Sequence, residues 1–265
     1  MGLCPTFFML RYLPIGSGAF IPAYNLFVGI GIALAMLYLQ YQPLFKEKSD
    51  NEKYKVHLSL LVSIIGGFAG AFLFDAYSQG IDLTFENISQ VGLTFFGGLI
   101  SGLSILMISL KLFKLPLLET LNILSLPFCI GHFFGRLGCF MAGCCYGSPT
   151  NGVFGVVFPR GSLPYDHFHE LIKIHPTQLY ESFFVLALFV FLLQTKYRNP
   201  FYGYLISYAI FRFLVEFLRS DNRGIIFNQH TLSPSQMISL LTVITCIGLI
   251  YANRFLQTRK TLSQA

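Results

Sequence analysis

Side chains able to bind an anion, move a proton or act as a nucleophile gather in residues 131–150. Arg136 follows an apolar segment, and a fixed positive charge at a membrane boundary indicates that an anion binds there. His132 precedes it by four residues, so on a helix the imidazole would stack beside the guanidinium. That imidazole could serve as a general base. It could also hydrogen-bond a backbone carbonyl near the glycines, and the residues alone favour this second interpretation.

A second polar group interrupts an apolar segment near the C-terminus. Tyr208, Arg212, Glu216 and Arg219 recur at helical spacing and would share one helix face. An arginine at mid-membrane costs about 2.5–3.5 kcal/mol, so this face should point into the helix bundle or a wet cavity. Either Arg212 and Glu216 form an ion pair that locks helices together, or Arg212 and Arg136 clamp a phosphate through their planar guanidinium groups.

The three cysteines of this region, Cys139, Cys144 and Cys145, are open to several interpretations. Their C-x4-C-C spacing is not a common zinc pattern, even with His132 or His175 as further ligands, so we expect no metal site. A disulfide on an oxidising outer face and nucleophilic catalysis are alternatives with equally weak support.

The segment H-P-T-Q-L-Y-E at residues 175–181 opens another apolar stretch. Its proline suits the first helical turn, where a missing N–H is harmless. The polar side chains either anchor the start of this helix or, through His175, Gln178, Tyr180 or Glu181, shape a cavity. The sequence favours neither interpretation over the other.

The composition predicts an all-α polytopic membrane protein. Hydrophobic residues make up 54% of the 265 residues and charged residues only 11%, against about 25% in soluble proteins. The net charge is +6, but the basic residues form no single patch, which argues against nucleic acid as a partner. We expect one membrane domain over residues 1–265, with no soluble module and no cleaved signal peptide. Segments with the length of a span lie at about 22–41, 57–77, 91–110, 117–135, 177–195, 201–218 and 236–253.

The lysines predict the orientation of these seven spans. All lysines except Lys173 lie in alternate connections, which the positive-inside rule places in the cytoplasm. The N-terminus is then outside and the C-terminus cytoplasmic. Residues 136–176 form the longest outer segment and are expected to make a small external cap. Within this cap, residues 152–159 are expected to form a short strand or hairpin.

Taken together, the motifs resemble the prolipoprotein diacylglyceryl transferase family, in order and spacing along nearly the whole chain. The matching segments are G-x-x-x-G-R-L-G-C-F-x-A-G-C-C-Y-G-x-P-T at 131–150, H-P-T-Q-L-Y-E at 175–181, Y-x-x-F-R-x-x-V-E-F-x-R-x-D at 208–221, F-F-G-G-L-I at 95–100 and the Ala23-Tyr24 region. The resemblance implies transfer of the diacylglyceryl group of phosphatidylglycerol to the lipobox cysteine thiol of a prolipoprotein. It also implies the bacterial cytoplasmic (inner) membrane as the location and the bilayer as the surroundings, and it implies no cofactor.

The resemblance also suggests roles for particular residues. Arg136 corresponds to the phospholipid-binding arginine of the family and Arg212 to a second essential arginine, with Glu216 among the catalytic residues. The substrate-binding residues are expected to be Arg136, Tyr24, Gly98, His175, Tyr180, Tyr208 and Arg219.

This chain departs from the family pattern at positions that matter for proton transfer. Phe96 stands where much of the family has a histidine proposed as base, and Cys139, Ala142 and Cys144 replace a G-N-F-x-N-G-E pattern. Gly67-Phe68 lacks an arginine found in the family. We therefore hypothesise that His132 acts as the base. The alternatives are a lipid-binding or transport-like protein on the same scaffold, with redox or metal-binding cysteines, and a transferase that uses another thiol acceptor.

Overall fold

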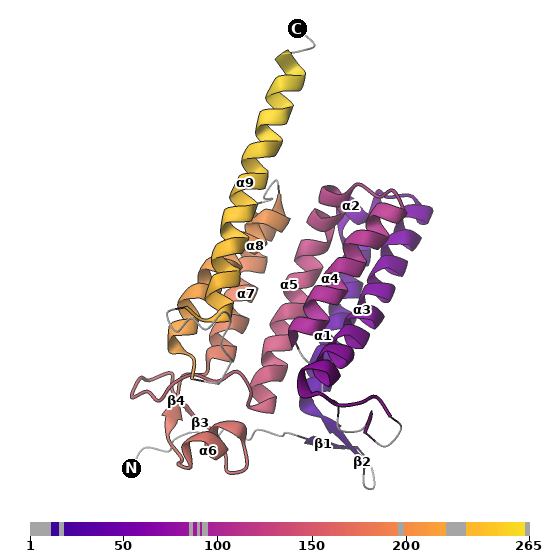
Figure 1. Cartoon of the computed structure of the whole chain (residues 1–265). Coiled ribbons are helices and arrows are strands. Elements are labelled where there is room, and N and C mark those ends of the chain that lie inside the picture. The colour runs from indigo at the N-terminus through magenta and orange to yellow at the C-terminus, as the bar shows by residue number, and fades with distance from the viewer. Residues whose placement is uncertain are drawn as a thin grey trace. The chain divides into compact units, whose positions relative to one another are not determined.

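The computed structural model describes residues 12–15, 19–84, 87–88, 91, 95–195, 199–220 and 232–262. These residues are mostly helical (Figure 1) and fall into two compact units. One unit comprises residues 40–123, and the other comprises the described residues before and after that segment.

Six helices among the described residues are long and apolar enough to cross a membrane. The protein is therefore an all-α polytopic membrane protein, as the composition predicts. A further helix, α4 (Phe95–Leu112), matches the third predicted span and is apolar but shorter over the residues that can be assessed. The six helices are α1 (Ala23–Tyr41), α3 (Asp50–Gln79), α5 (Leu117–Ala142), α7 (Thr177–Gln194), α8 (Pro200–Val215) with the 3-10 turn η2 (Glu216–Leu218), and α9 (Pro234–Leu262).

The unit of residues 40–123 contains α3 and α4, packed closely along their length, and the short helix α2 (Pro43–Lys46). The Ser63 hydroxyl donates to the Gly102 carbonyl across the pair at 2.7 Å. Helix α3 begins at Asp50, before the predicted start at residue 57, because Ser49 forms a capping box. Its hydroxyl accepts from the Glu52 N–H at 3.3 Å, and the Glu52 carboxylate accepts from the Ser49 N–H at 3.1 Å.

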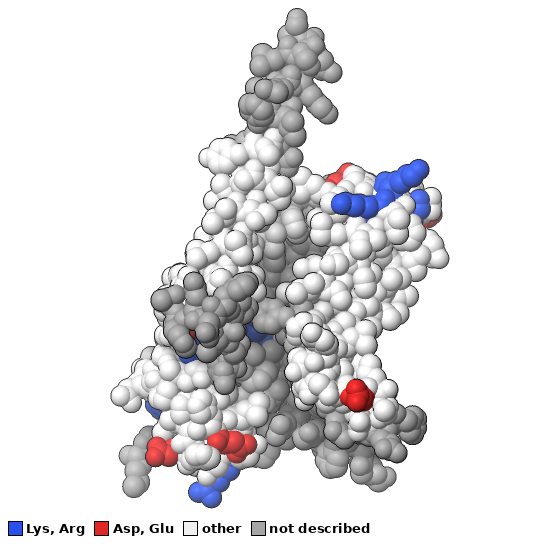
Figure 2. Space-filling model, viewed as in Figure 1, with Lys and Arg blue, Asp and Glu red and all other residues white. Residues whose placement is uncertain are grey.

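The surface of this unit is that of a protein embedded in lipid. Its basic side chains gather at the end where α2 lies, while the sides of the helices are almost free of charge (Figure 2). Leu61, Ile65 and Ile100 are each more than half exposed. Exposed apolar surface of this extent marks a membrane contact.

The second unit is built from α1, the later part of α5, and α7, α8 and α9. Helix α8 packs against both α7 and α9. Leu126 and Cys129 of α5, Val185 and Leu188 of α7, and Tyr204 of α8 form its buried apolar core. Arg219, which follows α8 and η2, forms an antiparallel bridge with Gly147 of the cap.

Helix α5 ends at Ala142, past the predicted end at residue 135, and Arg136 therefore lies inside the helix rather than at its mouth. The end is a Schellman motif, with Gly143 in the left-handed region at φ +72°. The Gly143 N–H donates to the Phe140 carbonyl at 3.1 Å, and the Cys144 N–H donates to the Cys139 carbonyl at 3.2 Å. The glycine that stops the helix is thus Gly143, not the two glycines before Arg136.

Short strands accompany the helices of this unit. Strands β1 (Tyr12–Ile15) and β2 (Ala19–Pro22) pair antiparallel. In the cap, β3 (Val156–Val157) pairs antiparallel with β4 (Lys173–Ile174). The expected strand in residues 152–159 is therefore present, but its partner is distant β4, so the segment does not fold into a hairpin.

The cap has a small core of its own. Phe140, Tyr146, Phe158 and Ile174 are buried together, and α6 (Leu163–Phe168) lies beside them. This core joins the end of α5 to the cap, which allows residues on both to share one site.

Candidate functional site

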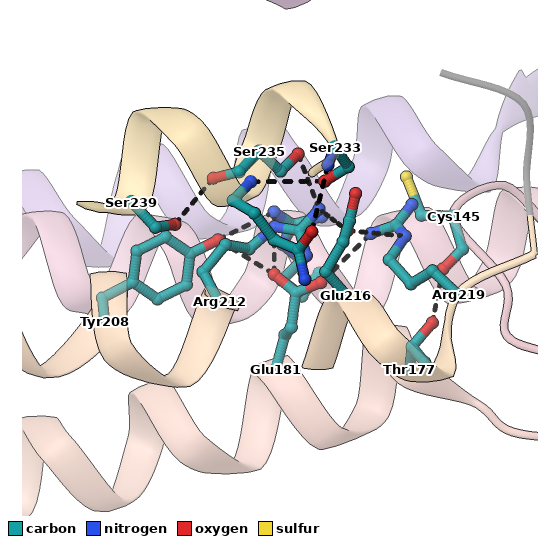
Figure 3. A network of polar contacts seen from close by, with 12 residues as sticks. Cys145, Thr177, Glu181, Tyr208, Arg212, Glu216, Arg219, Ser233, Ser235 and Ser239 are labelled. Carbon is teal, nitrogen blue, oxygen red and sulfur yellow. Dashed lines mark hydrogen bonds and ion pairs between the residues drawn. The ribbon is translucent and has the colours of Figure 1, made fainter. Parts of the chain in front are cut away.

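Glu181 is a fully buried carboxylate in α7 that collects donors from three other elements (Figure 3). Its Oε2 accepts from Arg136 Nη2 of α5 at 2.9 Å and from the Tyr208 hydroxyl of α8 at 2.9 Å. Its Oε1 accepts from Arg219 Nη1 at 3.2 Å. A buried carboxylate is tolerated only when charges and hydrogen bonds compensate it, so Glu181 fixes both arginines in place.

Arg212 and Glu216 form the second ion pair of the site, with Arg212 Nη2 and Glu216 Oε2 2.6 Å apart. Arg212 Nη2 also donates to the Ser235 hydroxyl of α9 at 3.0 Å. Arg219 Nε lies 4.0 Å from Glu216 Oε2, which links the two pairs. The ion pair that the sequence offered as an alternative to a phosphate clamp is therefore present. Arg212 Nη1 is nevertheless buried with no hydrogen-bond partner among the described residues.

We call Arg136, Arg212, Arg219, Glu181 and Glu216 the arginine cluster. Its three guanidinium groups and two carboxylates leave a formal excess of one positive charge. Guanidinium groups stay protonated in proteins, so the excess cannot be removed by titration. A monoanion with oxygen acceptors, such as a phosphodiester, would complement this charge and the planar donor forks.

His132 stacks against Arg136 as their four-residue spacing predicts. Its Nε2 accepts from Arg136 Nε at 3.3 Å, and its Nδ1 lies 2.7 Å from the Tyr204 hydroxyl. These two bonds assign the neutral tautomer with the proton on Nδ1. The lone pair on Nε2 is then engaged by Arg136, and the geometry supports a role in orienting that arginine. The role of His132 as base stays a prediction.

The three cysteines of residues 139–145, which we call the thiol cluster, lie together despite their uncommon spacing. Their Sγ atoms all lie within 4.8 Å of one another, and the side chains are partly exposed. The Schellman bond brings Cys144 back over Cys139. Cys145 follows in the left-handed region at φ +64°, a conformation that costs about 1–3 kcal/mol outside glycine.

Helix α7 holds the backbone of the thiol cluster in this strained form. Thr177 Oγ1 donates to the Cys145 carbonyl at 2.6 Å, and Gln178 Nε2 donates to the Cys144 carbonyl at 2.6 Å. Both α7 residues are fully buried. The polar start of α7 therefore anchors the cysteine turn.

The thiol cluster borders the arginine cluster. Figure 3 draws Cys145 beside Arg219. Hydrogen bonds with Cys139 and Cys144, and then the positive charges of Arg219 and Arg136, lower the pKa of the Cys145 thiol below its ordinary value. The surroundings therefore favour the anionic form of Cys145 only, since hydrogen bonds with Cys139 and Cys145 raise the pKa of the Cys144 thiol.

A close backbone contact at Gly147 joins the cap to the residues just before α7 and just after η2. Its N–H donates to the His175 carbonyl at 2.9 Å, and it bridges to Arg219. A Cβ at this position would lie 2.6 Å from His175 Cβ and 2.6 Å from the Leu218 carbonyl oxygen. Only glycine fits there, and this contact helps to position Arg219.

Two other predicted site residues pair with each other. His175 Nδ1 lies 3.1 Å from the Tyr180 hydroxyl, close to the cap. Tyr24 of α1 lies against α5, because a Cβ on Gly138 would be 3.2 Å from its ring. Tyr24 is thus adjacent in space to the residue before Cys139.

Gly98 belongs to the other compact unit. A Cβ on it would lie 3.2 Å from Ala71 Cβ and 3.3 Å from the Gly67 carbonyl oxygen of α3. These are contacts of helix packing between α4 and α3. A role of Gly98 in substrate binding stays a prediction. Phe96 lies in the first turn of α4 in the same unit, but its side chain lies outside the described residues, as does Asp221.

The sequence did not identify Glu181 as the shared partner of Arg136 and Arg219. It also did not show that Thr177 and Gln178 hold the cysteine turn. A carboxylate within an apolar span was the available signal, because charges inside membrane helices are rare and functional. Thr177 and Gln178 gave no comparable signal, since threonine and glutamine are common at the start of a helix.

The fold and the arginine cluster define a polytopic membrane protein with buried arginine–carboxylate ion pairs among its helices. A model of the prolipoprotein diacylglyceryl transferase family matches residues 13–252. The chain belongs to this family, which confirms the resemblance found in the motifs.

The sequence of this chain is similar to those of named relatives over most of their length. The phosphatidylglycerol–prolipoprotein diacylglyceryl transferase of Clostridium tetani is 34% identical over 90% of this chain and 95% of the relative. Transferase 2 of Clostridium perfringens is 33% identical over 92% and 95%. The enzyme of Chlorobaculum tepidum is 31% identical over 71% and 69%.

Proposed function

We propose that this protein transfers the diacylglyceryl group of phosphatidylglycerol to the lipobox cysteine thiol of prolipoproteins. The observation that carries the proposal is the arginine cluster, which combines an excess positive charge with a buried, unpartnered Arg212 Nη1. Phosphatidylglycerol supplies a phosphodiester monoanion of matching charge. Family membership and the names of the relatives support the same reaction.

The chemistry follows from the donor set. The acceptor sulfur attacks the glyceryl carbon, a C–S bond forms, and the C–O bond to phosphate breaks. The electron pair of that bond leaves with glycerol phosphate, on which negative charge grows. Arg136 and Arg212 are preorganised by Glu181 and Glu216, so they stabilise this charge in the transition state more than in the ground state.

The remaining predicted residues take supporting roles in this proposal. Glu216 holds Arg212, while His132 orients Arg136 or acts as base. Tyr208 and Arg219, which both contact Glu181, complete the set of side chains proposed to surround the phosphate. Tyr24, Gly98, His175 and Tyr180 contact lipid or peptide.

We place the protein in the bacterial cytoplasmic (inner) membrane with seven spans, α4 being the third. The N-terminus and the cap then face outward and the C-terminus faces the cytoplasm, in accord with the lysine distribution. The whole chain acts as a single membrane transferase domain. An outward cap places the thiol cluster on the side where secreted prolipoproteins emerge.

Complementation of a cell depleted of its own transferase tests the function. The wild-type chain should restore lipidation of a prolipoprotein, seen as a gel shift. Arg136→Ala should abolish lipidation while membrane insertion persists. Arg160→Ala is the matched control, because Arg160 is an exposed arginine of the cap. A protein that binds phosphatidylglycerol but never lipidates the acceptor would contradict the proposal and support a non-catalytic lipid-binding role.

Arg212→Lys tests the need for a planar fork. Lysine keeps the charge, but its donors all sit on one nitrogen. It therefore cannot hold Glu216 and Ser235 and also place a second nitrogen where Arg212 Nη1 lies. Turnover with phosphatidylglycerol and a lipobox peptide should fall about 10²–10³-fold. Turnover equal to wild type would remove Arg212 from the mechanism.

A further inference from the structure

The proposed transfer needs a deprotonated acceptor thiol, since the thiolate is the nucleophile. The imidazole of His132 is poorly placed to remove the thiol proton, because its Nε2 already accepts from Arg136. The thiol cluster borders the arginine cluster and contains no cationic group that would bind phosphate. Its geometry provides another way to activate a thiol.

We propose that Cys139, Cys144 and Cys145 bind one Zn²⁺ ion whose fourth ligand is the acceptor cysteine thiol. This inference rests on the proposed function for the identity of the fourth ligand. Catalytic zinc sites combine three protein ligands with one open position for water or substrate. Among the described residues, these three cysteines group without a fourth histidine, cysteine or carboxylate.

The distances suit a zinc–thiolate site. Zinc–sulfur bonds of about 2.3 Å place the sulfurs of a tetrahedral site about 3.8 Å apart. The three Sγ atoms already lie within 4.8 Å of one another. Small side-chain rotations therefore bring them to bonding positions, and soft thiolate ligands select Zn²⁺ over harder cations.

The backbone under these ligands is held before any ion binds. The Schellman bond from Cys144 to Cys139 fixes two ligands, and Thr177 fixes the left-handed Cys145 through its carbonyl. Gln178 holds the Cys144 carbonyl in the same way. Such outer contacts orient metal ligands and raise metal affinity. They also give a purpose to the polar start of α7.

The charges of the two clusters complement each other. Three thiolates and one Zn²⁺ carry a net charge of minus one, beside an arginine cluster with one excess positive charge. Arg136 lies one turn before Cys139 on α5, so the two side chains share a helix face. A thiolate held at the zinc would thus lie near the arginines that hold the phosphate leaving group.

The step balances without an oxidant or reductant. The acceptor thiol binds Zn²⁺ and releases its proton to water, because a coordinated thiol is deprotonated. Its sulfur then forms the C–S bond as the C–O bond to phosphate breaks, and the electron pair leaves with glycerol phosphate. The thioether product is a weaker ligand than thiolate and dissociates from the ion.

Metal binding is tested on the purified full-length protein in lipid nanodiscs. The protein should bind one Zn²⁺, and one Co²⁺ in its place should give the charge-transfer band of cobalt–thiolate coordination. Cys139→Ala, Cys144→Ala and Cys145→Ala should each lose the band. Cys246→Ala, which removes a buried thiol of α9, is the matched control and should keep it. The site would be overturned if all three cysteine variants still bound Zn²⁺. It would also be overturned if two of the three thiols formed a disulfide in freshly isolated membranes.

Coordination of the acceptor is tested with a lipobox peptide. The peptide should alter the visible bands of the cobalt protein and intensify the charge-transfer band, while its Cys→Ser form should do neither. Thr177→Val should weaken Zn²⁺ binding about 10–100-fold, and Thr177→Ser should restore it. Unchanged cobalt spectra with the thiol peptide would overturn the role of the ion in activation.

The two proposals fail in distinguishable ways. Arg136→Ala should lose transfer yet keep the cobalt band, whereas Cys145→Ala should lose both. Full transfer by chelated, zinc-free protein would leave the proposed function standing and refute zinc activation. One bound zinc with no transfer from phosphatidylglycerol by the wild-type protein would refute the proposed function, and with it the assignment of the fourth ligand.

Discussion

Replacing Glu181 by glutamine removes the charge that holds the arginine cluster together. The carboxylate is fully buried and accepts from Arg136 at 2.9 Å, Arg219 at 3.2 Å and Tyr208 at 2.9 Å. Glutamine offers one acceptor oxygen and directs an NH₂ group at the remaining donors. The formal excess charge of the cluster rises from one to two.

The expected cost follows from the loss of a buried ion pair. Breaking such a pair from one side costs about 3–5 kcal/mol, because the partner charge is left buried and uncompensated. For a chain of this size we expect the unfolding temperature to fall by on the order of 10 °C. Thermal unfolding of the detergent-solubilised protein measures the change. Glu170→Gln is the matched control, because Glu170 is an exposed carboxylate of the cap and should leave the temperature unchanged.

A second substitution tests the cause of the loss. Arg219→Gln in the Glu181→Gln background removes one of the stranded charges, so part of the lost stability should return. A double-mutant cycle isolates this coupling. If Glu181→Gln unfolds at the same temperature as Glu170→Gln, the cluster does not stabilise the fold and the reasoning is refuted. Strictly additive effects of the two substitutions would refute the proposed coupling.

Two further substitutions test the framework around the site. Gly147→Ala should lower both transfer and unfolding temperature, because its Cβ would lie 2.6 Å from backbone and side-chain atoms. Gly248→Ala, which meets nothing within 4 Å, should be neutral, and equal behaviour of the two in the same assays would contradict the packing argument. Ser49→Ala should cost about 1 kcal/mol by loss of the α3 capping box, measured by thermal unfolding. Ser78→Ala, near the other end of α3, should cost less; a larger loss there would count against the cap.

Much of the helical fold was predictable, because apolar runs of span length are unambiguous in composition. The errors fall at helix ends. Residues 131–135 contain two glycines, yet α5 continues to Ala142 because the left-handed Gly143 and its Schellman bonds decide where the helix stops. Similarly, α3 begins at Asp50 because its cap reaches into the polar loop.

The candidate site was predictable in part. Helical periodicity placed Arg136 beside His132, and Arg212 beside Glu216, since residues four apart on one helix are neighbours. The same logic could not assign Glu181 as the shared partner of Arg136 and Arg219, because those contacts join different helices.

The sequence by itself determined the class of protein, most of its long apolar helices and the arginines of the cluster. Those properties depend on composition and on spacing along one helix. Only the tertiary structure decided that Cys139, Cys144 and Cys145 meet, and that α7 holds them through Thr177 and Gln178. The physical reason is that a left-handed helix end reverses the chain, and hydrogen bonds from a distant helix then fix the reversal. Neither follows from local periodicity.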